Sequence, residues 1–454
     1  MLASDLESFE VAAARVRILE YTYDPNLHRA SGVVTYNLDS GIFRSFACVA
    51  HGRTGLLPQL QGLTWRTVDN EIYPYISLFL SPTITSLDIY ASSREPASEK
   101  MRFSLLVSLV SQCPSLRSLE LRGGPGLYDH ITSWRSLFSR YSAEACASFG
   151  IWENLSSLCL NHIDLCTLTE VLATLPALTK LTLTCCQAIS DSPLAPSSIQ
   201  GFPMLQHLCM EVCNMDSCFY VLNRLSRGTP LVYLELGVKG LPREYRWREL
   251  FNHLTAIISR DSLSILKFSV ANPLLDQGEK AVLMDIDTIS PLLHFRHISE
   301  FKYTGYCYLD LDDRDVVLMA MTWPHLKSFI LRLARLRLTH RAFLPFAKYC
   351  PELEVLGIMI DATKVDDYEE RPERESLGTR LQELIIFDSS IDDPHRVAAF
   401  ISDIFPNVVE ISFNIFKRFP TGPQNQTYLT KWKEVERLIP IFAAVRRQEA
   451  NHTS

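Results

Sequence analysis

The stretch CPSLRSLEL at residues 113–121 returns in a closely similar form, CPELEVLGI, at residues 350–358. Both copies follow the pattern Cys-Pro-x-Leu-x-x-Leu-x-aliphatic. In the first copy, Leu119 and Leu121 alternate with polar residues on either side, and this alternation predicts a short strand with one apolar and one polar face. A phrase that one chain carries twice predicts a repeating structural unit.

Weaker spellings of the phrase occur along most of the chain, and together with the two cysteine versions they make thirteen copies. The spacing between their first apolar anchors returns repeatedly to 26 to 28 residues. The anchors are Leu60, Ile84, Leu116, Leu155, Leu178, Leu205, Leu231, Leu263, Ile298, Leu326, Leu353, Leu381 and Val408. This motif at this spacing is the signature of the leucine-rich repeat. RVRILEY, with Val16, Leu19 and Tyr21 at the anchor places, predicts a fourteenth, degenerate copy.

After each strand the apolar period changes from two to that of a helix. Leu168, Val171, Leu172 and Leu175 follow the spacing i, i+3, i+4, i+7, as do Val397, Phe400, Ile401 and Ile404. One strand and one helix per repeat cannot bury an apolar face alone, so neighbouring repeats must stack. The sequence therefore predicts an α/β fold, a leucine-rich-repeat solenoid of the ribonuclease-inhibitor-like horseshoe type, with a parallel sheet on the concave face and helices on the convex face.

The repeats predict one solenoid domain over residues 1–424, with about 13 to 14 repeats. Residues 123–150 and 271–294 lengthen two of the repeats, and the polar stretch 361–379 replaces a helix, so we expect an exposed loop there. We expect residues 425–448 to form an amphipathic helix that caps the open end of the solenoid, with a disordered tail at 449–454. The inward residues of the cap are predicted to be Trp432, Val435, Leu438, Ile439 and Phe442.

The composition excludes several classes of function. A net charge of −7 over 454 residues does not fit a protein that neutralises phosphates, so we expect no nucleic-acid partner. Asp5, Glu7 and Glu10 stand where a signal peptide needs basic and apolar residues, and no apolar run is long enough to cross a membrane. Twelve cysteines, mostly inside apolar patterns, indicate buried thiols in a reducing compartment, so we expect a cytoplasmic or nuclear protein without a membrane partner.

Three local clusters could carry chemistry, but each has a simpler structural interpretation. His207, Cys209, Cys213 and Cys218 could bind zinc, although they lack paired close spacings and fit the repeat register. The glycines of RGGPGL predict a turn. Arg332, Arg335, Arg337 and Arg341 could bind a phosphate or an acidic peptide, and a solvated turn explains them as well. We therefore predict no enzyme activity, no cofactor and no metal site.

Phrases at both ends of the chain resemble a known family. DLESFEVAAARVRILEY followed by LLPQLQGLTW, the thirteen repeats, FPNV and WKEVERLIPIFAAVRRQE resemble the fungal F-box and leucine-rich-repeat proteins over nearly the whole chain. In that family the repeats hold a substrate, and an N-terminal F-box bundle binds the Skp1-type adaptor of a cullin-RING ubiquitin ligase. The F-box pattern is not found in this chain, so the resemblance implies an adaptor only if an F-box lies upstream.

We predict that the polar face of the strands recognises a protein or peptide partner. The candidate contact residues are Arg122, Asn161, Lys180, His207, Glu211, Glu235, Lys267, Lys302, Arg332 and Glu410. Their mixed charges are typical of a protein or peptide partner. The sequence leaves open two roles: the substrate-binding part of a ubiquitin-ligase receptor, and a stand-alone scaffold or inhibitor that binds a single protein.

Overall fold

Two compact units make up the chain in its computed structural model, Met1–Thr229 and Pro230–Ser454, here called unit 1 and unit 2. The residues that the structure describes are 3–23, 40–49, 55–67, 71–91, 97–123, 149–161, 165–186, 201–212, 214–239, 244–271, 283–305, 308–332, 337–365, 380–413 and 423–453. Among these described helices, none is both long and apolar enough to cross a membrane.

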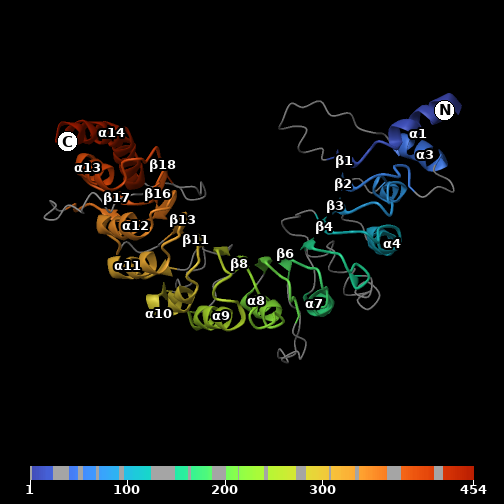
Figure 1. Cartoon of the computed structure of the whole chain (residues 1–454), viewed down its shortest axis with the longest axis horizontal. Helices are drawn as coiled ribbons and strands as arrows, with labels where there is room; N and C mark the ends of the chain where they lie inside the picture. The colour runs from blue at the N-terminus through green and yellow to red at the C-terminus, as the bar shows by residue number, and fades with distance from the viewer. Residues whose placement is uncertain are drawn as a thin grey trace. The chain divides into compact units, whose positions relative to one another are not determined.

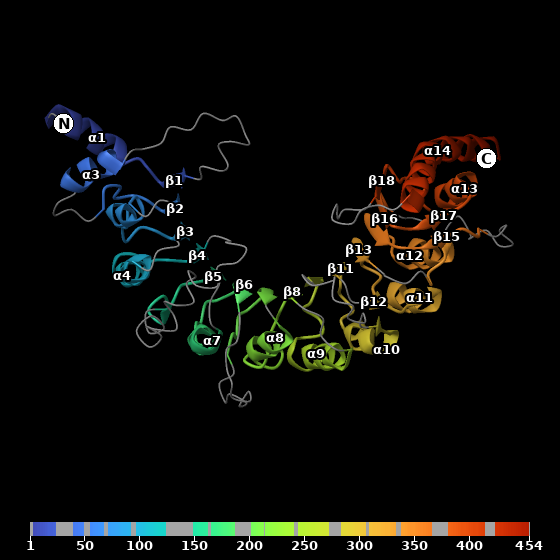
Figure 2. The ribbon, with the colours of Figure 1, turned by 180° about the vertical axis from the view of Figure 1, so that it is seen from behind.

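Unit 1 is built on a parallel sheet whose strands follow one another in chain order. Its helices lie on one side of the sheet (Figure 1), and the view from behind shows the same separation (Figure 2). The strands are β1 (Ile18–Tyr23), β2 (Gly62–Thr67), β3 (Ser86–Ala91), β4 (Ser118–Gly123), β5 (Ser157–Asn161), β6 (Lys180–Cys186) and β7 (His207–Val212). The helical segments are α1 (Ala3–Ala13), α3 (Ser40–Val49), η1 (Tyr73–Leu78), α4 (Ala97–Gln112), α7 (Leu165–Ala173) and α8 (Met215–Leu222).

Unit 2 repeats this architecture on a parallel sheet, again with its strands in chain order. The strands of that sheet are β8 (Tyr233–Lys239), β9 (Ile265–Ala271), β11 (Glu300–Gly305), β13 (Ser328–Leu331), β14 (Val355–Ile358), β16 (Glu383–Phe387) and β18 (Glu410–Phe413). The helical segments are α9 (Glu244–Ile257), α10 (Ile286–Ile289), η3 (Ser290–His294), α11 (Asp313–Thr322), η4 (His340–Ala342), α12 (Phe343–Tyr349), α13 (Pro394–Ile404) and α14 (Pro423–Thr453).

Two pairs of very short parallel strands link neighbouring repeats of unit 2 beside the main sheet. They are β10 (Leu283–Met284) with β12 (Tyr308–Leu309), and β15 (Asp361–Ala362) with β17 (Ser390–Ile391). Asp361 strengthens the second link because its carboxylate accepts a hydrogen bond from the Ser390 hydroxyl at 2.8 Å. Burial alone acts against the charged form, but this bond and those from Thr363 lower the pKa of Asp361.

The predicted repeat is confirmed copy by copy. Twelve of the thirteen anchors have 0% exposed area and Val408 has 7%, and one of the main parallel strands follows each anchor. The fourteenth copy is also present, since β1 begins at Ile18 within RVRILEY and Tyr21 is buried. Each buried leucine stabilises the fold by about 1.5 to 3 kcal/mol. The leucine-rich-repeat fold of both units thus follows from the sequence spacing.

The two halves of a repeat also agree with the predicted periods. Leu119 and Leu121 are buried while their polar neighbours in β4 are half-buried on the other face. In α13, the four residues predicted to face inward are all buried: Val397, Phe400, Ile401 and Ile404. In α7, Leu172 is buried and Val171 half-buried, and Leu175 is buried just beyond the helix. The side chain of Leu168 lies outside the described set.

The cysteine of the opening phrase serves the core in both copies. Cys113 and Cys350 follow the helices that precede the proline, and both have 0% exposed area. Burial raises the pKa of Cys113 to about 11 and that of Cys350 to about 12, so both thiols stay protonated at neutral pH. The indole nitrogen of Trp152 donates to the carbonyl oxygen of Cys113 at 3.1 Å, and the Cys350 thiol approaches the carbonyl oxygen of Trp323 at 3.6 Å. Both positions therefore contact a neighbouring repeat, Cys113 through its backbone carbonyl and Cys350 through its thiol.

The helix α14 packs against α13 at the end of unit 2. Trp432, Val435 and Ile439 are buried as predicted, while Leu438 and Phe442 are half-buried. The Trp432 indole nitrogen donates to the carbonyl oxygen of Ser389 at 2.9 Å. The helix begins at Pro423 and continues through Thr453, so it is longer than the predicted cap and includes most of the predicted tail.

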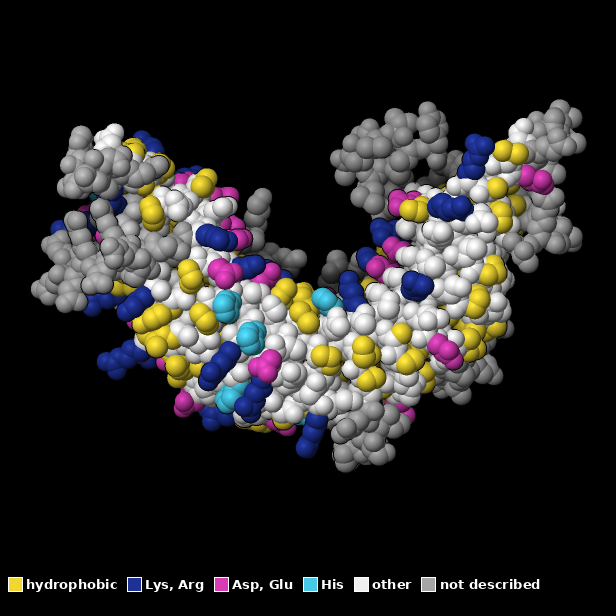
Figure 3. All heavy atoms as spheres, viewed as in Figure 1, with side chains coloured by type: hydrophobic (Ala, Val, Ile, Leu, Met, Phe, Trp, Pro, Cys, Tyr) yellow, Lys and Arg dark blue, Asp and Glu magenta, His cyan; other side chains and the backbone are white. Residues whose placement is uncertain are grey.

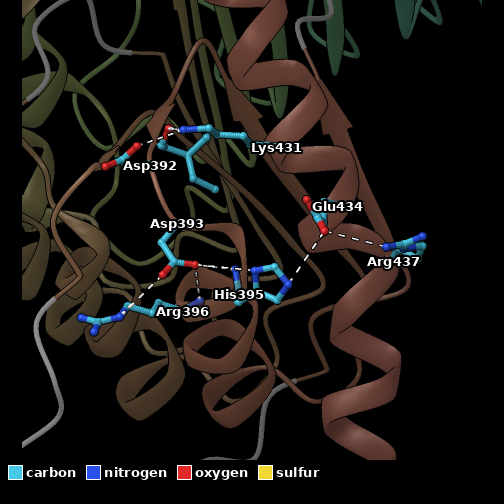
Figure 4. Close-up of polar contacts among 8 residues, drawn as sticks. Asp392, Asp393, His395, Arg396, Lys431, Glu434 and Arg437 are labelled. Carbon is cyan, nitrogen blue, oxygen red and sulfur yellow. Dashed lines mark hydrogen bonds and ion pairs between the residues drawn. The ribbon is translucent and has the colours of Figure 1, made fainter.

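Polar contacts fix this cap to the last repeat (Figure 4). Lys431 pairs with Asp392 at 3.0 Å, and the two ring nitrogens of His395 lie 3.8 Å from Asp393 and 3.9 Å from Glu434. The Glu436 carboxylate accepts the backbone N–H of Ile411 in β18 at 3.2 Å. A side chain of α14 thus satisfies a backbone group of the terminal strand, which would otherwise be an open sheet edge.

The lengthened repeats are described only in part. Residues 124–148 of the first insertion and 272–282 of the second lie outside the described residues, as do residues 366–379 of the predicted loop. What is described of the second insertion forms β10, α10 and η3. The predicted division into a single solenoid domain, a cap and a tail stays a prediction.

Candidate functional site

The register of the strands places the outward side chains of each sheet in rows. Face 1 denotes the outward residues of β1 to β7. Face 2 denotes those of β8, β9, β11, β13, β14, β16 and β18, together with Arg332, which directly follows β13. The helices lie on the opposite side of each sheet (Figure 1), so each face is the polar surface that the sequence predicts. All ten candidate contact residues belong to one of these faces: Arg122, Asn161, Lys180, His207 and Glu211 to face 1, and Glu235, Lys267, Lys302, Arg332 and Glu410 to face 2.

On face 1, the charged residues of the first strands pair with one another. Arg66 of β2 forms an ion pair with Asp88 of β3, and Arg122 forms one with Glu120 on its own strand. Burial alone lowers the pKa of the Arg122 guanidinium, but the carboxylates of Glu120 and Asp88 raise it overall. These charges are compensated within the face, so they stabilise the sheet without needing a partner.

The later strands of face 1 carry small polar side chains and a few exposed charges. The amide oxygen of Asn161 accepts a hydrogen bond from the Thr184 hydroxyl of the next strand. Lys180 and His207 are register neighbours, and both are exposed. Cys159 lies in the same face, and burial first and the nearby Glu120 second raise the pKa of its thiol. This region resembles a neutral polar surface more than a charged site.

Face 2 begins with a compensated cluster. The Lys267 ammonium lies 3.1 Å from the Glu300 carboxylate and 5.3 Å from the centre of the Tyr233 ring, an ion pair combined with a cation–π contact. The Tyr233 hydroxyl donates to Glu235. Lys302 lies directly beside Lys267 in the register, and its side chain is exposed. In the part of the chain that the structure describes, its ammonium has no ion-pair or hydrogen-bond partner.

Beyond Lys302, face 2 becomes apolar. Ile330 follows Lys302 in the register, and Gly357 and Ile385 continue the same row. A Cβ atom on Gly357 would lie 3.2 Å from Ile330 and 3.4 Å from Ile385, so these two side chains close over the glycine from both sides. Val355, on the same strand as Gly357, is half-buried, as is Ile330, whereas Ile385 is buried. We call Ile330, Val355, Gly357 and Ile385 the apolar floor.

Two carboxylates lie at the far end of face 2. Glu383 and Glu410 are register neighbours on adjacent parallel strands. The Ser412 hydroxyl is within hydrogen-bond distance of both, 2.9 Å from Glu383 and 3.2 Å from Glu410. Neither carboxylate forms an ion pair with a lysine or arginine among the described residues. Like charges side by side on neighbouring strands oppose folding slightly, so this end of the face is uncompensated.

The three clusters considered for other chemistry are resolved as follows. His207 and Cys209 lie on face 1, whereas Cys218 is fully buried in α8, and Cys213 is outside the described residues. In the arginine run, Arg332 lies 3.9 Å from Asp388 and Arg337 lies 3.0 Å from Asp310, while Arg335 is not described. Most of RGGPGL also falls outside the described residues. Where they are described, these clusters do not converge on one site.

Some residues of the face escaped sequence reasoning. Glu383 and the apolar floor were not among the predicted contact residues, because a single strand does not show which outward residues of neighbouring repeats lie side by side. Aligning every repeat on its anchor would have shown them, since Glu383 and Glu410 both stand two places after an anchor. On the side of unit 2 that Figure 3 displays, basic, acidic and histidine side chains are interspersed. No single-sign surface is visible there.

Comparison with known proteins finds similar solved structures at low identity. No protein-family model matches the sequence, and no curated protein matches it. Among solved structures, a leucine-rich-repeat protein of Leptospira interrogans is 15% identical, with 90% of this chain and 98% of that chain covered and a TM-score of 0.37. Rad7 and Elc1 from yeast, solved as a complex, match at 15% identity over 93% of this chain and 92% of that chain, with a TM-score of 0.37.

A third solved structure, the complex of TLR13 with ssRNA13, matches at 14% identity and a TM-score of 0.30, with 83% of this chain and 59% of that chain covered. Scores this low do not bear on function. The repeat spacing, the buried anchors and the parallel strands of each unit establish the chain as a leucine-rich-repeat protein.

Proposed function

We propose that the chain is a non-catalytic recognition protein that binds a protein or peptide partner on the sheet faces, chiefly on face 2. The supporting observation is that three charged side chains of face 2 lack an ion-pair partner among the described residues. Lys302, Glu383 and Glu410 lie on an open sheet face without an ion-pair partner among the described residues, and an apolar floor lies between them. Charges that a folded chain leaves uncompensated beside apolar surface are typical of interfaces, where a partner supplies the opposite charges.

We further propose that the partner is the substrate of a ubiquitin ligase, and that this chain acts as the substrate-binding part of an F-box-type receptor. The support is the resemblance of the N-terminal and C-terminal phrases to the fungal F-box and leucine-rich-repeat family. In this role a Skp1-type adaptor binds only through an F-box upstream of the chain. The cysteines inside apolar patterns, which indicate a reducing compartment, favour a location in the cytoplasm or the nucleus.

A stand-alone scaffold or inhibitor is the alternative role. Co-purification distinguishes the two, with the chain expressed from its full transcript in its native cells. Adaptor and cullin subunits in the eluate support the ligase role. A single partner in a stable one-to-one complex without those subunits supports the scaffold role and contradicts the ligase role.

The proposed binding face is tested by charge reversal. The variant Lys267→Glu, Lys302→Glu, Arg332→Glu changes three bases of face 2, and we expect it to lose most of the captured partner. A matched control reverses three exposed bases on the helices of the same unit, Arg314, Lys348 and Lys433, and should keep the partner. If both variants capture the same amount of partner, face 2 is not the binding surface.

A further inference from the structure

The two ends of face 2 have opposite charge requirements. Lys302 of β11 lacks an acidic partner in the described residues, because Glu300 on the same strand is already paired with Lys267 at 3.1 Å. Glu383 of β16 and Glu410 of β18 lack a basic one and share a single hydroxyl, that of Ser412. A ligand that satisfies both ends must be acidic near β11 and basic near β16 and β18.

Between these ends, the ligand must be apolar. Ile330, Val355 and Gly357 offer no side-chain donor or acceptor, and the isoleucines on either side of Gly357 leave no polar gap. A polar side chain held over this floor would lose its water without gaining a hydrogen bond. Apolar side chains gain about 25 cal/mol for each Å² that they bury. The middle of the ligand is therefore aliphatic or aromatic.

The strand geometry sets the spacing of these three features. Strands lie about 4.8 Å apart, and two residues along a strand span about 6.6 Å. From Lys302, face 2 crosses three strand spacings to Glu383 and four to Glu410, with a two-residue offset along the strands. The distance between the Cα atoms is thus about 16 to 20 Å. An extended peptide spans this distance in about five or six steps from one residue to the next.

We propose that face 2 binds an extended peptide segment with an acidic residue at one end, a large apolar residue near its middle and a basic residue about five or six positions from the acid. The proposal rests on the function proposed above and names the chemical class of the partner. The acidic residue pairs with Lys302, the apolar residue lies on Ile330 and Val355, and the basic residue lies between Glu383 and Glu410. On β2 to β4 of face 1, Arg66, Asp88, Glu120 and Arg122 already neutralise one another, so those strands offer no equivalent arrangement.

Selection from a phage-displayed library of random dodecapeptides on the full chain tests the spacing. We expect the enriched peptides to share the acidic, apolar and basic residues at the proposed distances. Affinities of synthetic copies are then measured by fluorescence anisotropy. The variant Lys302→Glu, Glu383→Lys, Glu410→Lys should weaken binding about tenfold or more. The control Lys180→Glu, Glu20→Lys, Glu211→Lys makes the same changes at exposed positions of face 1, and it should leave binding unchanged.

A second test exchanges the charges of the peptide and looks for a gain of binding. A synthetic peptide with its acidic and basic residues exchanged should bind the face 2 variant more tightly than the wild-type chain. The enriched peptides could lack the common spacing and still bind the face 2 variant more weakly than the wild-type chain. That result would overturn the proposed peptide pattern but not the binding face. If only the face 1 variant weakens peptide binding, or neither variant does, the site is wrong. If no peptide is enriched, the peptide proposal is wrong. Partner capture tests the proposed function independently.

Discussion

Face 1 and face 2 come from the same repeat, yet they treat their charges differently. On face 1, Arg66 pairs with Asp88 and Arg122 with Glu120, so the charges of neighbouring strands stabilise the sheet. On face 2, Lys302 is exposed and the neighbouring carboxylates of Glu383 and Glu410 share only a hydroxyl. The difference teaches that exposure alone does not mark a recognition surface. What distinguishes face 2 is charge that the fold leaves uncompensated around an apolar floor.

The cores of the two units, in contrast, are built alike, and their disruption should have the largest effect. Trp152 in unit 1 and Trp323 in unit 2 have 0% exposed area, and each donates its indole N–H to a backbone carbonyl, that of Cys113 and that of Phe295. Trp152→Ala and Trp323→Ala should each reduce the free energy of unfolding by about 3 to 5 kcal/mol, because each leaves a cavity and an unpaired carbonyl. Urea unfolding measures both. If one of the two variants loses less than about 1 kcal/mol of unfolding free energy and the other does not, the two cores are not built alike.

Single charge reversals should affect the free energy of unfolding differently on the two faces, by less than the tryptophan substitutions do. Arg122→Glu places a third carboxylate beside Glu120 and Asp88, so we expect it to lower the free energy of unfolding by about 0.5 to 1 kcal/mol. Lys302→Glu should change it by less than about 0.5 kcal/mol, since no described partner is lost. Urea unfolding at low ionic strength measures the two variants side by side. Equal losses would show that Lys302 is compensated after all.

The smallest expected effect has the opposite sign. Glu410→Gln removes one of two neighbouring carboxylates and keeps an acceptor for Ser412, so it should raise the free energy of unfolding by about 0.2 to 0.5 kcal/mol at low salt. The gain should disappear at high salt, because salt screens the repulsion between exposed charges. The matched change Glu120→Gln on face 1 should destabilise instead, since it removes the partner of Arg122. A loss of stability in Glu410→Gln would mean that the carboxylate is already paired.

The fold was predictable from the sequence because burial repeats with a fixed period. Every anchor from Leu60 to Val408 is buried, and the cysteines of the opening phrase occupy matching core positions at Cys113 and Cys350. The division into two units was not predicted, because the repeat spacing continues across Thr229 and Pro230 without a break. The length of α14 was underestimated, since residues beyond Gln448 continue the helix without an apolar stripe to mark it.

The candidate site was predictable only in part. The outward positions followed from the alternation in each strand, and all ten predicted residues lie on the two faces. Which charges are paired could not be read from single strands, because partners come from neighbouring repeats, as with Lys267 and Glu300. The apolar floor was also missed, since Ile330 and Ile385 look like ordinary strand residues until the register brings them together over Gly357.

Site-specific photo-crosslinking tests the central claim most directly. A benzophenone amino acid replaces Val355 on the apolar floor, and in a matched variant it replaces Leu318, which is 46% exposed on α11. The account predicts that a bound peptide or captured partner crosslinks at position 355 and not at position 318, with the link on an apolar residue between an acidic and a basic one. Crosslinking at position 318 alone, or equally at both, would contradict recognition on face 2.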